Sequence, residues 1–155
     1  MTAMRLGIVF ATLVALAACN DPKSKVEAAA DQAGRAVDKL EGDVIAGHLA
    51  AAKAALAADT EPAEPCTWAS ANPAATQPDA VALRRLCSFD APLRRATRAV
   101  VAAEKARAEL PDAPSLTECQ SETWSAAKRL LDRDHAAEPT WTALAARWSK
   151  ACPGT

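Results

Sequence analysis

Residues 24–58 repeat small and apolar side chains at alternating steps of four and three, and this spacing limits the fold more than any other feature. We call the repeating positions the heptad seam: Val26, Ala30, Ala33, Val37, Leu40, Val44, Gly47, Ala51 and Ala54. Such spacing keeps one face of an α-helix apolar along its length. Ser24, with Glu27 three residues later, fits an N-terminal capping box. The pattern therefore predicts a long helix whose seam packs against either the rest of this chain or another subunit.

The remaining sequence also predicts helices, so the expected fold class is all-α. Alanine is abundant, tyrosine is absent and only five glycines occur, a composition that favours helices over strands. Residues 59–78 contain four prolines, which remove backbone donors, and are predicted to be a loop. Residues 79–155 are predicted to form a small bundle of about four shorter helices.

Prolines and polar residues divide this bundle. Pro92 predicts a turn at 88–91, because the residue before a proline avoids the helical region. The next helix ends near Leu110, and another follows from about 115 to 135. Its expected inward stripe is Leu116, Cys119, Thr123, Ala126 and Leu130. A last helix, starting near Pro139, carries Trp141, Leu144, Ala145, Trp148 and Cys152 on one face. The last two helices are predicted to form an antiparallel hairpin that turns near 135–138.

Four cysteines beyond residue 58 are spaced too widely for a zinc site. They are Cys66, Cys87, Cys119 and Cys152, whereas structural zinc sites use short Cys-x-x-Cys spacings. An even number of cysteines is typical of disulfides in exported chains, and it predicts two disulfides here because the first 19 residues, described next, have the order of an export signal. The expected hairpin brings Cys119 beside Cys152, which leaves Cys66 to pair with Cys87.

The first 19 residues have the order of a bacterial export signal. Arg5 supplies a positive charge, and residues 6–15 form an uncharged apolar run that is shorter than the roughly 20 residues of a spanning helix. Leu16, Ala17, Ala18 and Cys19 follow. This segment resembles the lipobox of bacterial lipoproteins. The resemblance implies a diacylglyceryl group on the Cys19 thiol, cleavage before Cys19 and anchoring to a membrane through the lipid.

Together with the patterns above, the resemblance predicts a division of the chain and a location. Residues 1–18 would be the cleaved signal peptide, 19–58 the lipid anchor and long helix, 59–78 the loop, and 79–155 the disulfide-bonded helical domain. The lipid would hold the protein in the cell envelope, facing the periplasm. Asn20 rather than aspartate follows Cys19, which favours the outer membrane over the inner membrane.

Five arginines gather around the centre of the predicted bundle: Arg84, Arg85, Arg94, Arg95 and Arg98. Guanidinium groups bind carboxylates and phosphates, so this cluster could meet an acidic protein or lipid phosphates. The alternative is a solvated helix face balanced by acidic neighbours. The whole chain has 18 basic and 19 acidic residues, a balance that predicts no nucleic-acid partner.

Two segments contain histidine, a residue that can ligate metals. Asp132, Asp134, His135 and Glu138 flank the predicted hairpin turn, where polar helix ends are the alternative explanation. His48 has no neighbouring ligand and is expected to be exposed. No metal or cofactor is predicted, and the sequence contains no recognisable nucleophile–base set, glycine-rich phosphate loop or haem motif.

These features together predict a protein that is not an enzyme. We expect a lipid-anchored envelope protein that binds or positions another envelope protein. Two alternatives stay open: an inhibitor or immunity-type protein against a lytic envelope enzyme, and a binder of a small ligand or metal in the helical core.

Overall fold

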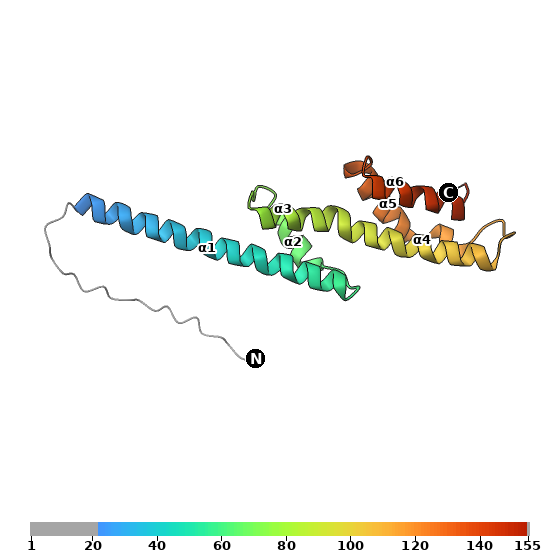
Figure 1. Ribbon diagram of the computed structural model, residues 1–155, viewed down its shortest axis with the longest axis horizontal. Coiled ribbons are helices and arrows are strands. Elements are labelled where there is room, and N and C mark those ends of the chain that lie inside the picture. The colour runs from blue at the N-terminus through green and yellow to red at the C-terminus, as the bar shows by residue number, and fades with distance from the viewer. Residues whose placement is uncertain (1–21, 155) are drawn as a thin grey trace. The chain divides into compact units, whose positions relative to one another are not determined.

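The computed structural model describes residues 22–154, which fold into helices without any strand (Figure 1). In chain order the elements are α1 (Pro22–Ala57), α2 (Ala63–Ala71), α3 (Pro78–Arg85), η1 (Leu86–Asp90), α4 (Ala91–Glu109), η2 (Thr117–Gln120), α5 (Glu122–Asp134) and α6 (Pro139–Ala151). The prediction of an all-α fold with a long N-terminal helix is therefore confirmed. Within the described range, no helix has the length and apolarity needed to cross a membrane.

The chain divides into two compact units, and the boundary falls inside α1 after Asp38. The described part of the first unit, residues 22–38, is helical and exposes Val26 by 70% and Val37 by 61%. The second unit, described over residues 39–154, contains the end of α1 and all later helices. The packing described below belongs to this second unit.

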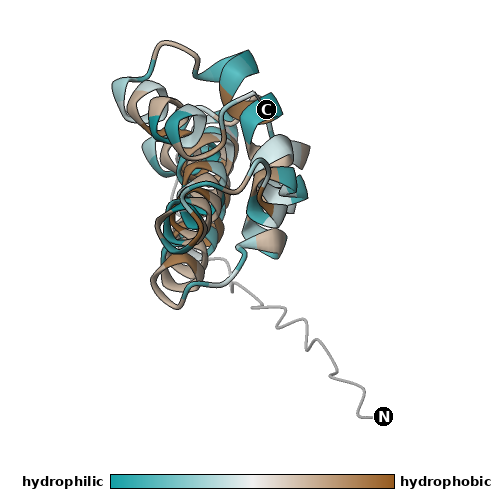
Figure 2. Cartoon of the chain, turned by 90° about the vertical axis from the view of Figure 1, so that its right-hand side faces the viewer, coloured by the Kyte–Doolittle hydropathy of each residue, from teal (hydrophilic) through white to brown (hydrophobic). Residues whose placement is uncertain are grey.

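The second unit contains two apolar cores along one helical track, in which α3 continues through η1 into α4 (Figure 1). The first core consists of Leu49, Ala52, Ala69, Leu83 and Leu86. The second core consists of Phe89, Ala96, Ala99, Val100, Ala103, Trp124, Ala127, Leu131, Trp141, Leu144, Trp148, Ala151 and Cys152. Hydrophobic and hydrophilic residues alternate around the helices that supply them (Figure 2), as amphipathic packing requires.

Each core is bridged by one disulfide. Cys66 of α2 is bonded to Cys87 of η1, with 5.4 Å between the Cα atoms. Cys119 of η2 is bonded to Cys152 just after α6, with 5.5 Å between the Cα atoms. Both pairings are those expected from the cysteine spacing. A domain with so many alanines has little apolar area per residue to bury, and covalent bridges compensate for this.

The end of α1 packs on the first core with a face other than the heptad seam. Ile45, Leu49 and Ala52 are buried, whereas the seam residues Leu40 and Val44 are 66% and 50% exposed. At about 100° per residue, these two faces lie about 140° apart around the helix. Within residues 39–154 the chain therefore leaves its seam uncovered.

His48 was expected to be exposed, and this expectation is wrong. Its ring is half-buried and stacks on Trp68 of α2, with 5.1 Å between ring centroids. The position follows from the packing face, because His48 is one helical turn after Ile45 and borders the buried side. This contact helps to hold α1 against α2.

The turn predicted before Pro92 does not form. Instead the five residues of η1 are π-helical, and the chain passes from α3 into α4 without reversing direction. In a regular α-helix the Pro92 ring would clash with the carbonyl four residues earlier. The π turn, in which the Ala91 N–H donates to the Leu86 carbonyl, is wider and accommodates the ring. Pro92 is buried as a result.

The predicted loop over 59–78 contains a helix, α2. Pro62 is the N-cap and Pro65 lies in the first turn, where backbone N–H groups have no intrahelical partner to lose. Pro73 follows the C-cap residue Asn72. These prolines therefore flank a helix and do not interrupt it.

Helix α5 starts later than predicted and buries a different stripe. Its N-cap is Ser121, whose side chain accepts a hydrogen bond from the Trp124 N–H at 3.2 Å. Trp124, Ala127 and Leu131 are buried, whereas Thr123 is exposed. The predicted stripe is right at Leu116, which is buried, and at Cys119, which packs on the second core. It is wrong at Thr123, because the large Trp124 side chain beside it takes the interior position.

Helices α5 and α6 meet through their tryptophans. Both helices pack on α4, and they are joined by residues 135–138, as predicted. Trp124 stacks on Trp148 with 4.3 Å between ring centroids and lies 5.3 Å from the Trp141 ring. The inward face predicted for α6 is confirmed, since Trp141, Leu144 and Trp148 are buried.

Candidate functional site

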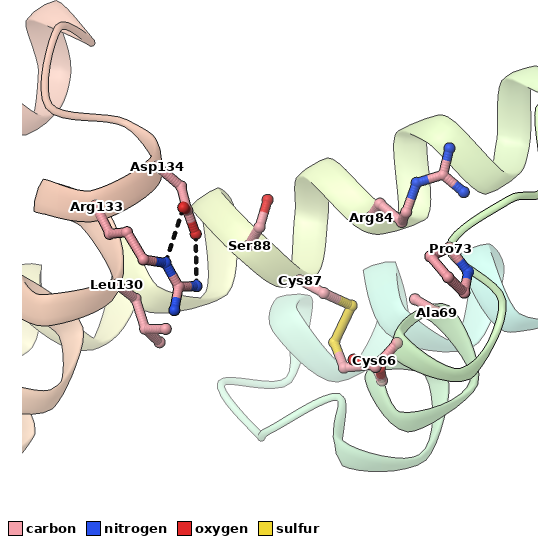
Figure 3. A pocket seen from close by; sticks show the side chains of 10 residues that line it. Cys66, Ala69, Pro73, Arg84, Cys87, Ser88, Leu130, Arg133 and Asp134 are labelled. Atoms are coloured by element: carbon pink, nitrogen blue, oxygen red, sulfur yellow. Dashed lines mark hydrogen bonds and ion pairs between the residues drawn. A yellow bond between two sulfur atoms is a disulfide. The ribbon is translucent and has the colours of Figure 1, made fainter.

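A groove of about 430 Å³ lies over the junction of α3 and η1, between α2 and the C-terminal end of α5 (Figure 3). It is lined by Cys66, Ala69, Ser70, Pro73, Arg84, Cys87, Ser88, Leu130, Arg133 and Asp134. This volume falls within the range of ligand pockets. Helix α2 packs in the first core and α5 in the second. The surface of α3 and η1 between these two helices is therefore left open, and this opening is the groove.

The π segment and the first disulfide shape the groove. Cys87 and Ser88 are consecutive residues of η1 that line it. The bond from Cys87 to Cys66 fixes the α2 wall to this floor (Figure 3). On the opposite side, Ser88 Oγ lies 3.2 Å from His135 Nε2, just beyond α5. Single π turns inside α-helices are frequent at functional sites, and here one is placed in the floor of a hollow.

The charged residues of the groove differ in how well they are paired. The Arg133 guanidinium donates two hydrogen bonds to the Asp134 carboxylate, at 2.8 and 2.7 Å (Figure 3). These bonds hold the pKa of Asp134 below its ordinary value. Arg84 is half-buried and donates a 3.4 Å hydrogen bond to the Asn72 carbonyl. Among the described residues it forms no ion pair.

The other four arginines of the predicted anionic-partner patch pair with carboxylates of this chain. The nitrogen–oxygen distances are 2.6 Å for Arg98–Asp59, 3.9 Å for Arg94–Asp59, 3.4 Å for Arg95–Glu61 and 3.2 Å for Arg85–Glu138. Asp59 and Glu61 lie between α1 and α2, and Glu138 precedes α6. These four positions therefore fit the alternative interpretation, a solvated helix face whose charge is balanced by acidic neighbours. Arg84 is the exception, and it lines the groove.

Asp59 directs this pairing through an unusual backbone conformation. Its φ is +57°, in the left-handed region, and it ends α1 in a Schellman motif. There the Thr60 N–H donates to the Ala55 carbonyl at 2.8 Å, and the Asp59 N–H donates to the Leu56 carbonyl at 3.1 Å. Aspartate tolerates this region better than most L-residues.

We expect Asp59→Ala to lower the free energy of unfolding by about 1 kcal/mol, because alanine is strained in the left-handed region. The exposed ion pairs with Arg94 and Arg98 contribute little by comparison. The control is Asp59→Asn. Asparagine removes the charge but also tolerates the left-handed region, so this variant should have almost the stability of the wild type. Urea unfolding of both variants distinguishes backbone strain from ion pairing; equal losses would mean that the charge is what matters.

The four polar residues considered as a metal site are occupied by separate contacts. Asp132 accepts hydrogen bonds from Lys128 and from Trp141 Nε1, Asp134 pairs with Arg133, His135 contacts Ser88, and Glu138 pairs with Arg85. Within residues 22–154, no group of three or more His, Cys, Asp or Glu side chains is arranged to hold a metal ion. Their contacts instead join the end of α5 to η1 and α6.

The Asp132 contact predicts a pH dependence. Hydrogen bonds from Lys128 and then Trp141 hold the pKa of Asp132 below its ordinary value of 3.8. A carboxyl group with a lowered pKa stabilises the fold above that ordinary value, and the contribution is lost as the pH falls below it. We expect the stability difference between wild type and Asp132→Asn to shrink from pH 6 to pH 3. Urea titrations followed by tryptophan fluorescence measure this difference, and a difference that stays constant between pH 6 and pH 3 would contradict it.

Sequence patterns identified only part of the groove. The sequence singles out Cys66, Cys87, Arg84 and Asp134, but for other reasons. Ser70, Ser88 and Leu130 had not been assigned to any site, and they meet only in the folded chain. Pro92 in an otherwise helical pattern is the available signal, because departures from regular α-helix geometry occur at prolines and at π turns.

The proposed lipidation site, Cys19, lies outside the described residues. The described chain begins three residues later, at Pro22 in the first turn of α1. Comparison of the sequence and structure with protein-family models, curated proteins and solved structures found no match.

Proposed function

We propose that this protein is a lipid-anchored envelope adaptor that binds a segment of another envelope protein in the groove over η1. The anchor is a lipid on Cys19, and the domain faces the periplasm, with the outer membrane favoured. The observation that carries the binding role is the chemistry of the groove: a mostly apolar lining with one half-buried arginine that lacks an ion-pair partner among the described residues.

The lining defines the segment that fits. The disulfide Cys66–Cys87, Ala69, Pro73 and Leu130 offer apolar surface, which would bury an aliphatic or aromatic side chain. Arg84 provides a fork of donors that suits a carboxylate. Arg133 offers less, because Asp134 already occupies its guanidinium. The favoured ligand is therefore an apolar peptide segment with a carboxylate, supplied by Asp, Glu or a chain end.

Site-specific photo-crosslinking in intact cells tests this proposal. A photoreactive amino acid replaces Ser70 at the groove and, in a matched variant, Ser149 on the exposed side of α6. We expect a discrete adduct from position 70 and none of the same mass from position 149. Sequencing the adduct should find an apolar segment that includes an acidic residue or a chain end.

Charge reversal provides the second part of the test. Arg84→Glu should abolish the position-70 adduct, because it places a carboxylate against the ligand's carboxylate. Lys105→Glu makes the same change on an exposed side chain of α4 and should leave the adduct unchanged. Circular dichroism confirms that each variant is folded. An adduct that survives Arg84→Glu, or equal adducts from positions 70 and 149, would contradict binding in the groove.

A further inference from the structure

The heptad seam of α1 gathers most of the exposed large apolar side chains. Seven such residues occur within residues 22–154, and four of them, Val26, Val37, Leu40 and Val44, belong to the seam. Their exposed fractions lie between 50% and 70%. Apolar side chains at single exposed positions are ordinary, but a row repeated with heptad spacing on one helix is the surface that a second helix covers.

The seam is separate from the contacts that hold the second unit together. Ile45, Leu49 and Ala52 face the first core from another side of α1, as described above. The spacing from Val26 to Ala54 covers about four heptads, or roughly 42 Å of helix, which is long enough for a coiled coil. None of the seam positions in this range carries a charge.

We infer that a second copy of this chain occupies the seam, as a parallel, in-register two-stranded coiled coil. In heptad terms the seam places Ala30, Val37, Val44 and Ala51 at position a and Ala33, Leu40, Gly47 and Ala54 at position d. In a parallel, in-register pair, the residue just before each a position of one helix faces the residue just after the next d position of the other helix. The resulting pairs are Ala29–Gly34, Ala36–Glu41, Asp43–His48 and Ala50–Ala55. No pair brings like charges together, and the one pair of polar groups joins a carboxylate to an imidazole. The flanks of the seam therefore oppose no like charges in this register, and Asp43 and His48 form its one complementary polar pair.

The parallel orientation rests on the proposed function. Two chains anchored at Cys19 in one membrane begin their helices at the same height, and the short segment before Pro22 leaves little slack for one helix to run the opposite way. Anchoring also confines the chains to two dimensions, which raises their effective concentration. The seam contains alanine and glycine as well as valine and leucine, so pairing between free chains in solution would be weak. On a membrane the higher effective concentration allows the two helices to pair.

Thiol crosslinking in native membranes tests the inference on the full chain. The four later cysteines are consumed in disulfides, and Cys19 would carry the lipid, so an introduced cysteine is the free thiol. Val26→Cys and Val44→Cys place it on the seam; Ala28→Cys and Ala46→Cys place it two residues away on another face. We expect a short bismaleimide to give several-fold more crosslinked dimer with both seam variants than with their controls. An antiparallel pair has a single centre, so it could bring at most one of positions 26 and 44, which lie about 27 Å apart along the helix, near its own copy.

A second substitution checks that packing along the seam causes the crosslink. Leu40→Glu in the Val26→Cys chain should lower dimer formation several-fold, because it places two carboxylates in one seam layer. Lys39→Glu, off the seam, should not. Equal crosslinking of seam and control variants would overturn the inference, as would a seam crosslink that Leu40→Glu leaves intact. Crosslinking of the wild-type chain through a free Cys19, or its release from membranes, would instead show that the proposed anchoring has failed.

Discussion

Replacing both Cys119 and Cys152 with alanine should lower the free energy of unfolding by about 4 kcal/mol. The bond closes a loop with a sequence separation of 33 residues, and the chain-entropy model gives a stabilisation of about this size for such a loop. It also attaches η2 to the end of α6, where Cys152 is 1% exposed within the second core. Urea unfolding measured under non-reducing conditions gives the loss.

The matched comparison is the Cys66→Ala, Cys87→Ala double variant. Its loop has a sequence separation of 21 residues, for which the same model gives about 3.3 kcal/mol, against about 3.7 kcal/mol for the longer loop. The bond between α2 and η1 also holds the α2 wall of the groove. We therefore expect this variant to lose the position-70 crosslink under conditions in which the domain is still folded. A Cys66→Ala, Cys87→Ala chain that keeps the position-70 crosslink unchanged would contradict the role of this bond in holding the groove wall.

Trp148→Ala should lower the free energy of unfolding by about 3–5 kcal/mol, the usual cost of removing a large buried aromatic side chain. Trp148 is 2% exposed and stacks on Trp124 at the centre of the second core. Leaving a cavity there removes the contact through which α5 and α6 meet. Near-ultraviolet circular dichroism should also lose the signal of the stacked indoles.

Leu110→Ala is the control for this variant. Leu110 follows α4 and is 58% exposed, so its truncation should change the free energy of unfolding by no more than about 0.5 kcal/mol. A similar loss in both variants would mean that the tryptophan cluster is not the centre of the core.

The fold was largely predictable where the spacing of residues within a single helix determined the structure. Heptad spacing predicted α1, and the face of α6 followed from Trp141, Leu144 and Trp148. The cysteine pairing followed once α5 and α6 were expected to reverse direction near residues 135–138. Errors arose at prolines, because a proline is tolerated in a first turn, as at Pro65 in α2, and can be accommodated by a π turn, as at Pro92.

The candidate site was less predictable, because it depends on contacts between distant elements. The arginine patch was visible in the sequence, but the left-handed Asp59 that turns a carboxylate towards Arg98 was not. Similarly, Ser70 and Leu130 line one groove only because α2 and α5 belong to different cores. Spacing along one helix contains no information about such contacts.

Mass spectrometry of the mature N-terminus, purified from membranes, tests most directly the claim on which the proposed function rests, that a lipid on Cys19 anchors this helical protein. We expect a terminal peptide that begins at Cys19 and carries a diacylglyceryl group, and we expect Cys19→Ser to lose that modification and leave the membrane fraction. A chain that retains residues 1–18, or that begins at Cys19 without lipid, would contradict the anchor.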